Sequence, residues 1–251
     1  MIKDDSREFI RNVFESVVTK YDSMNDFMTL GSHRLWKKHF CALSKIKNQN
    51  PQKILDMSCG TGDISIQILK LNPDSIITMC DPEIEMLNIA NSKIINSGFS
   101  VKNINIENST AEEFTMSKYI NFYDICFTSF GVRNFSNIKI GSSNIYNSLK
   151  NGGKWMVMEF SSDFLSHVNI ENQTKFLKIK QKILEFYIKS IIPQIGFVVA
   201  NDKSSYQYLS DSILKFPKSS DFIAILKSAG FKEVYKINFV KDIVNIYIAN
   251  K

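Results

Sequence analysis

Apolar and polar positions along the middle of the chain follow a pattern in which short strands alternate with helices. Apolar runs predict buried strands at 54–57, 75–80, 101–107, 122–128 and 154–160. Apolar residues at helical spacing predict helices at 63–71, 83–96 and 142–149. Parallel strands need a crossover connection, usually a helix, so this alternation indicates a doubly wound α/β sheet.

The two ends of the chain depart from this alternation. Helices are predicted at 7–20 and 37–50 before the first strand, and at 168–192 and 219–227 after the fifth. Two more strands, 232–239 and 243–249, are separated by a short turn and predict an antiparallel hairpin. We therefore expect a seven-stranded, mostly parallel sheet with an antiparallel C-terminal hairpin, an N-terminal helical cap and a helical insertion after strand 5.

A single domain, 1–251, is expected from the length of the chain and its hydrophobic content of 44%. Its parts are a helical cap at 1–50, a cofactor-binding core at 51–160, a helical lid or insertion at 161–218, and a terminal helix and hairpin at 219–251.

Charge and cysteine content limit the partners and the compartment. The net charge of +6 suits an acidic partner, either nucleic acid or an anionic membrane face, but scattered lysines are equally consistent with simple solubility. No C-x-x-C pair occurs, so we expect no zinc site and a cytoplasmic location or a similar reducing compartment, such as the mitochondrial matrix. The longest apolar stretch, 191–200, is broken by Pro193 and Gly196 and is too short to span a bilayer.

Candidate cofactor chemistry follows the first two strands. Gly60 and Gly62 allow close approach of a ligand to the backbone, and Thr61 and Asp63 add polar contacts. Asp81 ends the second strand, where α/β nucleotide-binding folds place a carboxylate for ribose hydroxyls. Together they predict a cofactor that contains a ribose.

Candidate residues also follow the third and fourth strands. Thr110 and Ala111 lie where an adenine ring needs a backbone contact and a small neighbour. Ser129 ends the fourth strand, and Arg133 with Asn134 comes just after it, where reacting groups converge. Neither an Asn/Asp-Pro-Pro-aromatic tetrapeptide nor a Pro-Cys pair is present, which argues against a nucleic-acid base as the acceptor.

The segment 21–36 is unusually rich in aromatic, acidic and imidazole groups. Functional loops often have this composition. The alternative is that its apolar residues pack a helical cap while Asp22 and Asn25 act as helix caps.

The layout of five parallel strands and a terminal hairpin resembles the class I S-adenosylmethionine-dependent methyltransferases. More specifically, the chain resembles the ubiquinone/menaquinone biosynthesis C-methyltransferase family over nearly its whole length. The most specific match is Lys20-Tyr21-Asp22-Ser23-Met24-Asn25-Asp26 through Gly31-Ser32-His33-Arg34-Leu35-Trp36-Lys37. Further matches are 129–134, 149–153, Glu159-Phe160, 206–209 and Phe216-Pro217. Cys59 and Asn151 stand where the family usually has Gly and Pro.

This resemblance implies S-adenosylmethionine as the cofactor, no metal, and a polyprenyl benzoquinol or naphthoquinol as the substrate. It puts Thr61, Asp81, Thr110, Ala111 and Ser129 at cofactor contacts and Arg133 with Asn134 on the acceptor side. Substrate-binding positions are Tyr21, Asn25 and Trp36. Arg is a poor base because it stays protonated. We therefore expect Arg133 to stabilise a phenolate or to orient a water, and Asn134 to position the ring. Asp22 or His33 is expected to take the proton.

An isoprenoid substrate would give a use to the basic charge and to the amphipathic 168–192 helix, namely weak binding to a membrane surface. Two other functions remain consistent with the sequence. One is methylation of another small molecule or of RNA, and the other is a catalytically idle binding subunit of a biosynthetic complex, which Cys59 makes conceivable. A homodimer is consistent with the sequence as well.

Overall fold

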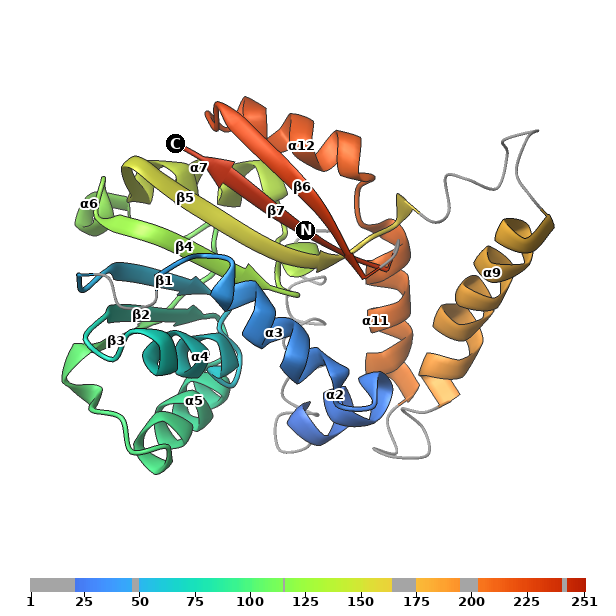
Figure 1. Ribbon diagram of the computed structural model, residues 1–251, viewed down its shortest axis with the longest axis horizontal. Coiled ribbons are helices and arrows are strands. Elements are labelled where there is room, and N and C mark those ends of the chain that lie inside the picture. The colour runs from blue at the N-terminus through green and yellow to red at the C-terminus, as the bar shows by residue number, and fades with distance from the viewer. Residues whose placement is uncertain (1–20, 47–49, 115, 164–174, 195–202, 241–242) are drawn as a thin grey trace, which may run out of the picture.

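The computed structural model describes residues 21–46, 50–114, 116–163, 175–194, 203–240 and 243–251 (Figure 1). These ranges contain a seven-stranded sheet with the order β3-β2-β1-β4-β5-β7-β6. The strands are β1 Lys53–Met57, β2 Ile76–Asp81, β3 Ile104–Asn108, β4 Tyr123–Ser129, β5 Leu149–Phe160, β6 Glu233–Val240 and β7 Val244–Asn250. The predicted mostly parallel sheet with an antiparallel hairpin is confirmed. The predicted helix at 7–20 lies outside the described residues.

Strand β1 lies at the centre of the parallel part, between β2 and β4. Its residue Leu55 is paired with Thr78 on one side and with Cys126 on the other. Both faces of β1 are covered, which is why the strand has an almost continuous apolar sequence instead of an alternating one. The central register brings the carboxyl ends of β1, β2 and β4 to one edge of the sheet.

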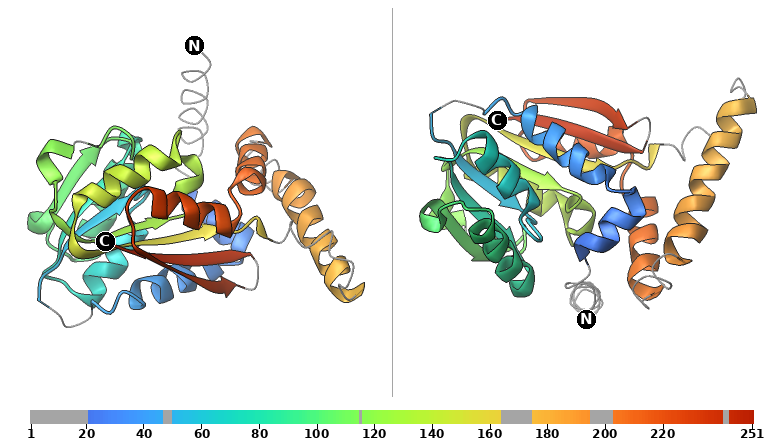
Figure 2. Two further views of the ribbon diagram at one scale, coloured as in Figure 1. Left: turned by 90° about the horizontal axis from the view of Figure 1, so that it is seen from above. Right: turned by 60° about the horizontal axis from the view of Figure 1, so that its bottom comes forward.

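Helices cover both faces of the sheet (Figures 1 and 2). One face carries α3 Ser32–Ala42, α4 Asp63–Leu71 and α5 Ile84–Asn96, and the other carries α6 Met116–Tyr119, α7 Ile138–Ser148 and α12 Ser219–Ser228. Each layer forms its own apolar core, and a third core, defined by Ile188, Ile192, Tyr206 and Ile213, lies in the insertion. Among the described helices, none has the length and apolar composition needed to cross a membrane.

The insertion contains α9 Lys175–Phe186, the π-helical turn η5 Tyr187–Ile191, and α11 Lys203–Lys215. A single helix was expected at 168–192, and its described part changes to a π-helical turn at Tyr187. The pattern did not predict α11, because serine is frequent in this helix and weakens its helical signal. Helix α11 lies beside the carboxyl ends of the parallel strands, near α2 Tyr21–Thr29, and α9 lies on the outer side of α11 (Figure 1).

The N-terminal segment differs from the expectation in its boundaries. The helix expected at 37–50 begins at Ser32 and ends at Ala42, and the chain then turns at Lys45, whose φ is +60°. Segment 21–36 is helical apart from the turn at Leu30 and Gly31, so it is not a loop. Phe27 and Leu30 are exposed, however, and Asn25 lies inside α2, so the structure does not show the packing and helix-capping roles considered for these residues. The third strand starts at Ile104, because the preceding residues form a 3-10 turn capped by Ser100 Oγ.

Two glycines with nearly the same backbone conformation test how tightly the turn after β1 is packed. Gly62 has φ +80° and would place a Cβ 2.8 Å from Ala90 Cβ, whereas Gly98 has φ +78° and open space around it. We expect Gly98→Ala to reduce the free energy of unfolding by about 1 kcal/mol through backbone strain alone. Gly62→Ala should cost roughly 1–3 kcal/mol more, because the clash is with a packed helix. Urea unfolding measures both, and equal losses would contradict this account.

Candidate active site

The turn after β1 is held in an unusual backbone conformation. Ser58, Gly60 and Gly62 all have positive φ, at 57°, 52° and 80°. This geometry folds the chain back within five residues and starts α4 at Asp63. The backbone of Gly60 is partly exposed with open space where a Cβ would stand, so a ligand can approach it closely. Gly62 is instead buried against Ala90 of α5, so this glycine serves the packing of the turn and not a direct approach of a ligand.

Asp81, at the end of β2, holds this turn in place. Its Oδ2 accepts a hydrogen bond from Gly60 N at 2.9 Å, and its Oδ1 accepts one from Glu83 N at 3.0 Å. Burial raises the pKa of Asp81 to about 6, although these two bonds oppose the shift. A carboxylate has about four acceptor positions, so Asp81 can still accept two bonds from a ribose diol. The structure therefore fits the predicted role.

Thr110 and Ala111 follow β3 and are held by hydrogen bonds, one local and one from α7. Thr110 Oγ1 accepts from Glu113 N at 3.2 Å, and Ala111 O accepts from Asn144 Nδ2 at 3.0 Å. Ala111 is buried in the second core. Its side chain lies against Gly141 of α7, so a contact between Ala111 and an adenine ring stays a prediction.

Two buried polar atoms near the end of β4 have no hydrogen-bond partner among the described residues. They are Ser129 Oγ and Arg133 Nε. Other buried side-chain atoms of the described residues, such as Ser75 Oγ and Ser142 Oγ, also lack a partner. The significance of Ser129 and Arg133 therefore comes from their position at the carboxyl end of β4, where ligands bind in sheets of this type. A cofactor beside Ser129 and an acceptor beside Arg133 would supply the missing partners, so the chain's own groups fit both ligands.

Arg133 lies in the short helix η3 Val132–Asn134 and forms a buried ion pair with Glu159 of β5. Arg133 Nη1 donates to Glu159 Oε1 at 3.0 Å and also to Phe130 O. Glu159 is fully buried and accepts further bonds from the backbone N–H groups of Arg133 and Phe160. The guanidinium is therefore fixed in position, and its Nε has no hydrogen-bond partner among the described residues.

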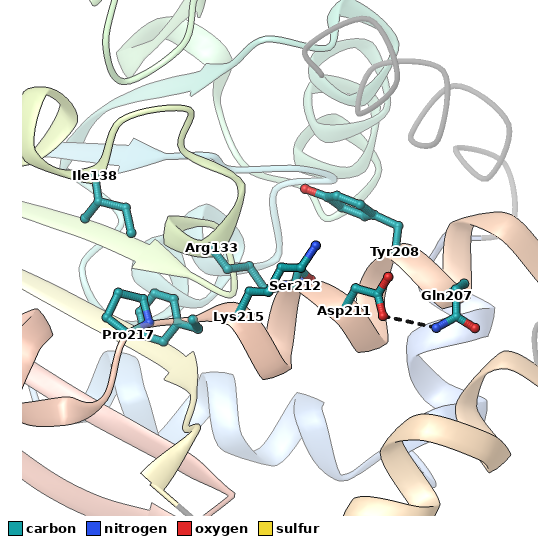
Figure 3. A pocket seen from close by; sticks show the side chains of 9 residues that line it. Arg133, Ile138, Gln207, Tyr208, Asp211, Ser212, Lys215 and Pro217 are labelled. Atoms are coloured by element: carbon teal, nitrogen blue, oxygen red, sulfur yellow. Dashed lines mark hydrogen bonds between the residues drawn. The ribbon is translucent and has the colours of Figure 1, made fainter. Parts of the chain in front are cut away.

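A pocket of about 530 Å³ opens beside Arg133, between η3 and α11 (Figure 3). Its lining residues are Arg133, Ile138, Gln207, Tyr208, Asp211, Ser212, Lys215, Phe216 and Pro217. The Tyr208 hydroxyl donates to Asn134 Oδ1 at 3.1 Å, which joins α11 to η3. Burial raises the pKa of Tyr208, so its hydroxyl remains a donor at neutral pH.

The N-terminal signature residues are spread over α2 and α3. Asp22 accepts from Thr61 Oγ1 at 2.7 Å, which brings the cap to the cofactor turn. His33 is buried, and its Nδ1 lies 2.8 Å from Thr29 Oγ1; burial and the nearby Lys37 lower its pKa. Within the described ranges, no hydrogen bond or ion pair joins Asp22 or His33 to Arg133.

The three predicted substrate-binding residues also belong to the cap. Asn25 is half-buried, and its carbonyl accepts from Thr29 Oγ1 at 2.6 Å. Trp36 packs partly buried against the first core. Tyr21 begins α2, and only its backbone is described. Their contact with a substrate stays a prediction.

Cys59 packs into the first core, so its side chain does not occupy the cofactor side of the turn. Its pKa is raised by burial, and the sulfur contacts only the carbonyl of Gly60 among hydrogen-bond acceptors in the described chain. A side chain at position 59, where the family usually has Gly, could crowd the cofactor if it pointed toward it, but the structure shows the Cys59 side chain in the core. In the same described ranges, no three His, Cys, Asp or Glu side chains gather as a metal site would require.

Residue types alone did not reveal the roles of Glu159, Tyr208 and Lys93. Glu159 and Tyr208 lie in segments that match the family, but no contact could be assigned to them from sequence. Lys93 is one of many lysines on predicted helices. Each of the three forms its contact with a residue at least 26 positions away in the chain: Glu159 with Arg133, Tyr208 with Asn134, and Lys93 with Asp22.

Comparison with known proteins agrees with this geometry. The model of the ubiE/COQ5 methyltransferase family matches residues 1–251. A ubiquinone/menaquinone biosynthesis C-methyltransferase UbiE from Rickettsia prowazekii is 37% identical over 250 residues, covering 96% of this chain and 92% of the relative. The UbiE protein of Haemophilus ducreyi is 32% identical over 246 residues, covering 98% and 88%.

Among solved structures, a SAM-dependent methyltransferase from Thermotoga maritima aligns with a TM-score of 0.60 over 96% of this chain and 99% of that one. Sequence identity is 13%, so this likeness concerns the fold alone. The full-length family match and the UbiE relatives carry the assignment: this chain belongs to the ubiE/COQ5 methyltransferase family.

Proposed function

We propose that the protein transfers the sulfonium methyl group of S-adenosylmethionine to a ring carbon of a polyprenyl benzoquinol or naphthoquinol. The names of its UbiE relatives support this acceptor class. The observation that carries the proposal is the pair of unpartnered buried donors, Ser129 Oγ and Arg133 Nε, at the end of β4. Ser129 Oγ suits a contact with the cofactor, and Arg133 Nε suits a hydrogen bond to an oxygen of the acceptor ring.

The cofactor half of the site is formed by the turn at Gly60–Gly62 and by Asp81, Thr110 and Ser129. When bound, the cofactor supplies an electrophilic methyl group, and the protein contributes mainly by positioning. Asp81 accepts hydrogen bonds from the ribose hydroxyls, and the closely packed turn excludes water on its side.

The acceptor half is formed by Arg133, Asn134 and Tyr208. A quinol ring carbon becomes a good nucleophile when a neighbouring phenol loses its proton, so stabilising that phenolate accelerates transfer. Arg133 Nε donates to the phenolate oxygen, and the buried Glu159 keeps the guanidinium aimed at it. Asn134, oriented by the Tyr208 hydroxyl, positions the ring.

The group that takes the phenol proton is proposed to be Asp22 or His33. The lowered pKa of His33 keeps its imidazole neutral near pH 7, which a base requires. Both oxygens of Asp22 are already engaged, one by Thr61 and one by Lys93. His33 is therefore the better-prepared base, and its approach to the ring would need the cap to shift.

No observation favours the two alternative functions. The idle-subunit hypothesis depended on Cys59, whose side chain lies in the core. Transfer of labelled methyl groups to total RNA instead of lipid extract would support the other alternative and contradict the quinol proposal.

We also propose that α9 contacts a membrane surface, from which the acceptor is collected. Ile179, Ile183 and Phe186 are 50%, 64% and 60% exposed and lie on one side of this helix. Lysines occupy several neighbouring positions of α9, so an anionic bilayer offers both apolar and charge contacts.

The pKa of Asp81 predicts a pH dependence for cofactor binding. Burial raises this pKa to about 6, so the carboxylate loses its acceptor capacity as pH falls through that value. Calorimetry should show constant affinity for S-adenosylmethionine above about pH 7 and affinity about tenfold weaker at pH 5. Asp81→Asn should bind S-adenosylmethionine more weakly at pH 7, and its affinity should not fall between pH 7 and pH 5 because the amide does not titrate. An unchanged profile in that variant would contradict the assignment.

Replacing Arg133 tests the acceptor half. Arg133→Lys keeps a charge beside Glu159 but loses the Nε donor, so we expect kcat at saturating quinol to fall about 100-fold with little change in cofactor affinity. Lys215→Ala is the control, because Lys215 lines the same pocket but is exposed. Undiminished turnover in Arg133→Lys and Arg133→Ala would refute the role.

Vesicle co-sedimentation tests the proposed membrane contact. The protein should bind anionic vesicles at low ionic strength and dissociate as salt is added. Ile183→Glu should weaken binding about tenfold, because it removes an apolar group and adds a repelled charge. Ile140→Glu is the matched control, since Ile140 is 47% exposed but lies on α7. Absence of binding even at low ionic strength would contradict the proposal.

A further inference from the structure

Lys93 of α5 lies at the junction of the N-terminal cap and the cofactor turn. Its Nζ is 2.8 Å from Asp22 Oδ2 of α2 and 2.7 Å from Asp63 Oδ1 at the start of α4. The same Nζ donates to Thr61 Oγ1 at 3.1 Å. One ammonium group thus contacts three residues from two segments that are far apart in the sequence.

The surrounding groups complete a charge-balanced network. Lys37 of α3 pairs with the other oxygen of Asp63 at 2.8 Å, so two lysines face two carboxylates. Lys93 and Asp63 are 29% and 25% exposed, which shields their attraction less than at an open surface. Burial would raise the pKa of Asp63, but Lys37 and Lys93 outweigh it and lower the pKa, so the carboxylate stays charged.

The Thr61 hydroxyl takes part in this network as both a donor and an acceptor of hydrogen bonds. A hydroxyl has one proton to donate and two acceptor positions. Thr61 donates to Asp22 Oδ1 at 2.7 Å and accepts from Lys93, which leaves one acceptor position. A charged cofactor end that contacts Thr61 therefore meets a hydroxyl whose orientation is set by the cap.

The opposite end of α2 is attached to the insertion. The Tyr187 hydroxyl donates to Met28 O at 3.0 Å, and Met28 packs on the third core with Tyr206 of α11. Helix α2 thus extends from the cofactor turn to the insertion whose α11 lines the pocket beside Arg133 (Figures 1 and 3). A displacement of Asp22 is expected to reach both halves of the site.

We propose that Lys93 is a positioning residue that aligns the N-terminal cap with the cofactor turn by bridging Asp22 to Asp63 and Thr61. The inference rests on the proposed function in taking this turn as the cofactor site. It predicts that Asp22, a residue of the cap, influences cofactor affinity through Lys93 even when no acceptor is present.

A double-mutant cycle tests the bridge. Calorimetry without acceptor measures the S-adenosylmethionine Kd of the full chain, Asp22→Asn, Lys93→Met and the double variant. Each single change should weaken binding about fivefold, and the double variant should be no weaker than Lys93→Met, which gives a coupling of about fivefold. Lys93→Arg should recover most of the affinity, because a guanidinium can also bridge two carboxylates.

Controls separate this inference from the proposed function. Lys70→Met, at an exposed position of α4, should leave Kd unchanged. If Lys93→Met does not fold, Lys93→Gln takes its place in the cycle. Additive effects, or a Kd unaffected by either change, would overturn the bridge and leave the proposed function intact. Coupled changes in Kd in a protein that methylates no quinol would overturn the proposed function and leave the bridge intact.

Discussion

The hydrogen bond from Gly60 N to the Asp81 carboxylate is the contact on which the site is built. It joins the ends of two neighbouring parallel strands, and it holds a turn that only glycine-rich sequence can adopt with little strain. The carboxylate is buried to form this bond, so it resists ionisation more than an exposed aspartate does. A buried acceptor with spare capacity is thereby placed where parallel sheets of this type bind their cofactors.

A buried charge pair, Arg133 with Glu159, organises the part of the site beside the pocket. Glu159 receives the Arg133 guanidinium and two backbone N–H groups, so the end of β5 and the helix η3 are tied together. Such pairs contribute little net stability, but loss of one partner leaves an uncompensated buried charge and costs about 3–5 kcal/mol. The value of the pair here is geometric, because it fixes the guanidinium beside the pocket while the Nε of Arg133 has no partner among the described residues.

The cap and the insertion are remote in sequence, yet α2 of the cap contacts the insertion. The Asp22 contacts at one end and the Met28 carbonyl at the other connect the cofactor turn to the wall of the pocket. This arrangement explains why the N-terminal signature is chemically dense although its residues are helical. Some of its polar groups, such as the Asp22 carboxylate, hold α2 against the site. A polar residue of the signature therefore need not contact a substrate.

Local sequence determined the strand and helix order of residues 53–160, the glycine turn, Asp81 and the family, because these depend on apolar periodicity and on short motifs. It did not determine α11, whose serine-rich sequence becomes helical by packing on the third core. Nor did it reveal the partners of Arg133, Asn134 and Asp22, which lie 26, 74 and 71 residues away. Such contacts form only when the sheet register brings distant strand ends to one edge, so tertiary structure alone decided which of the candidate residues meet.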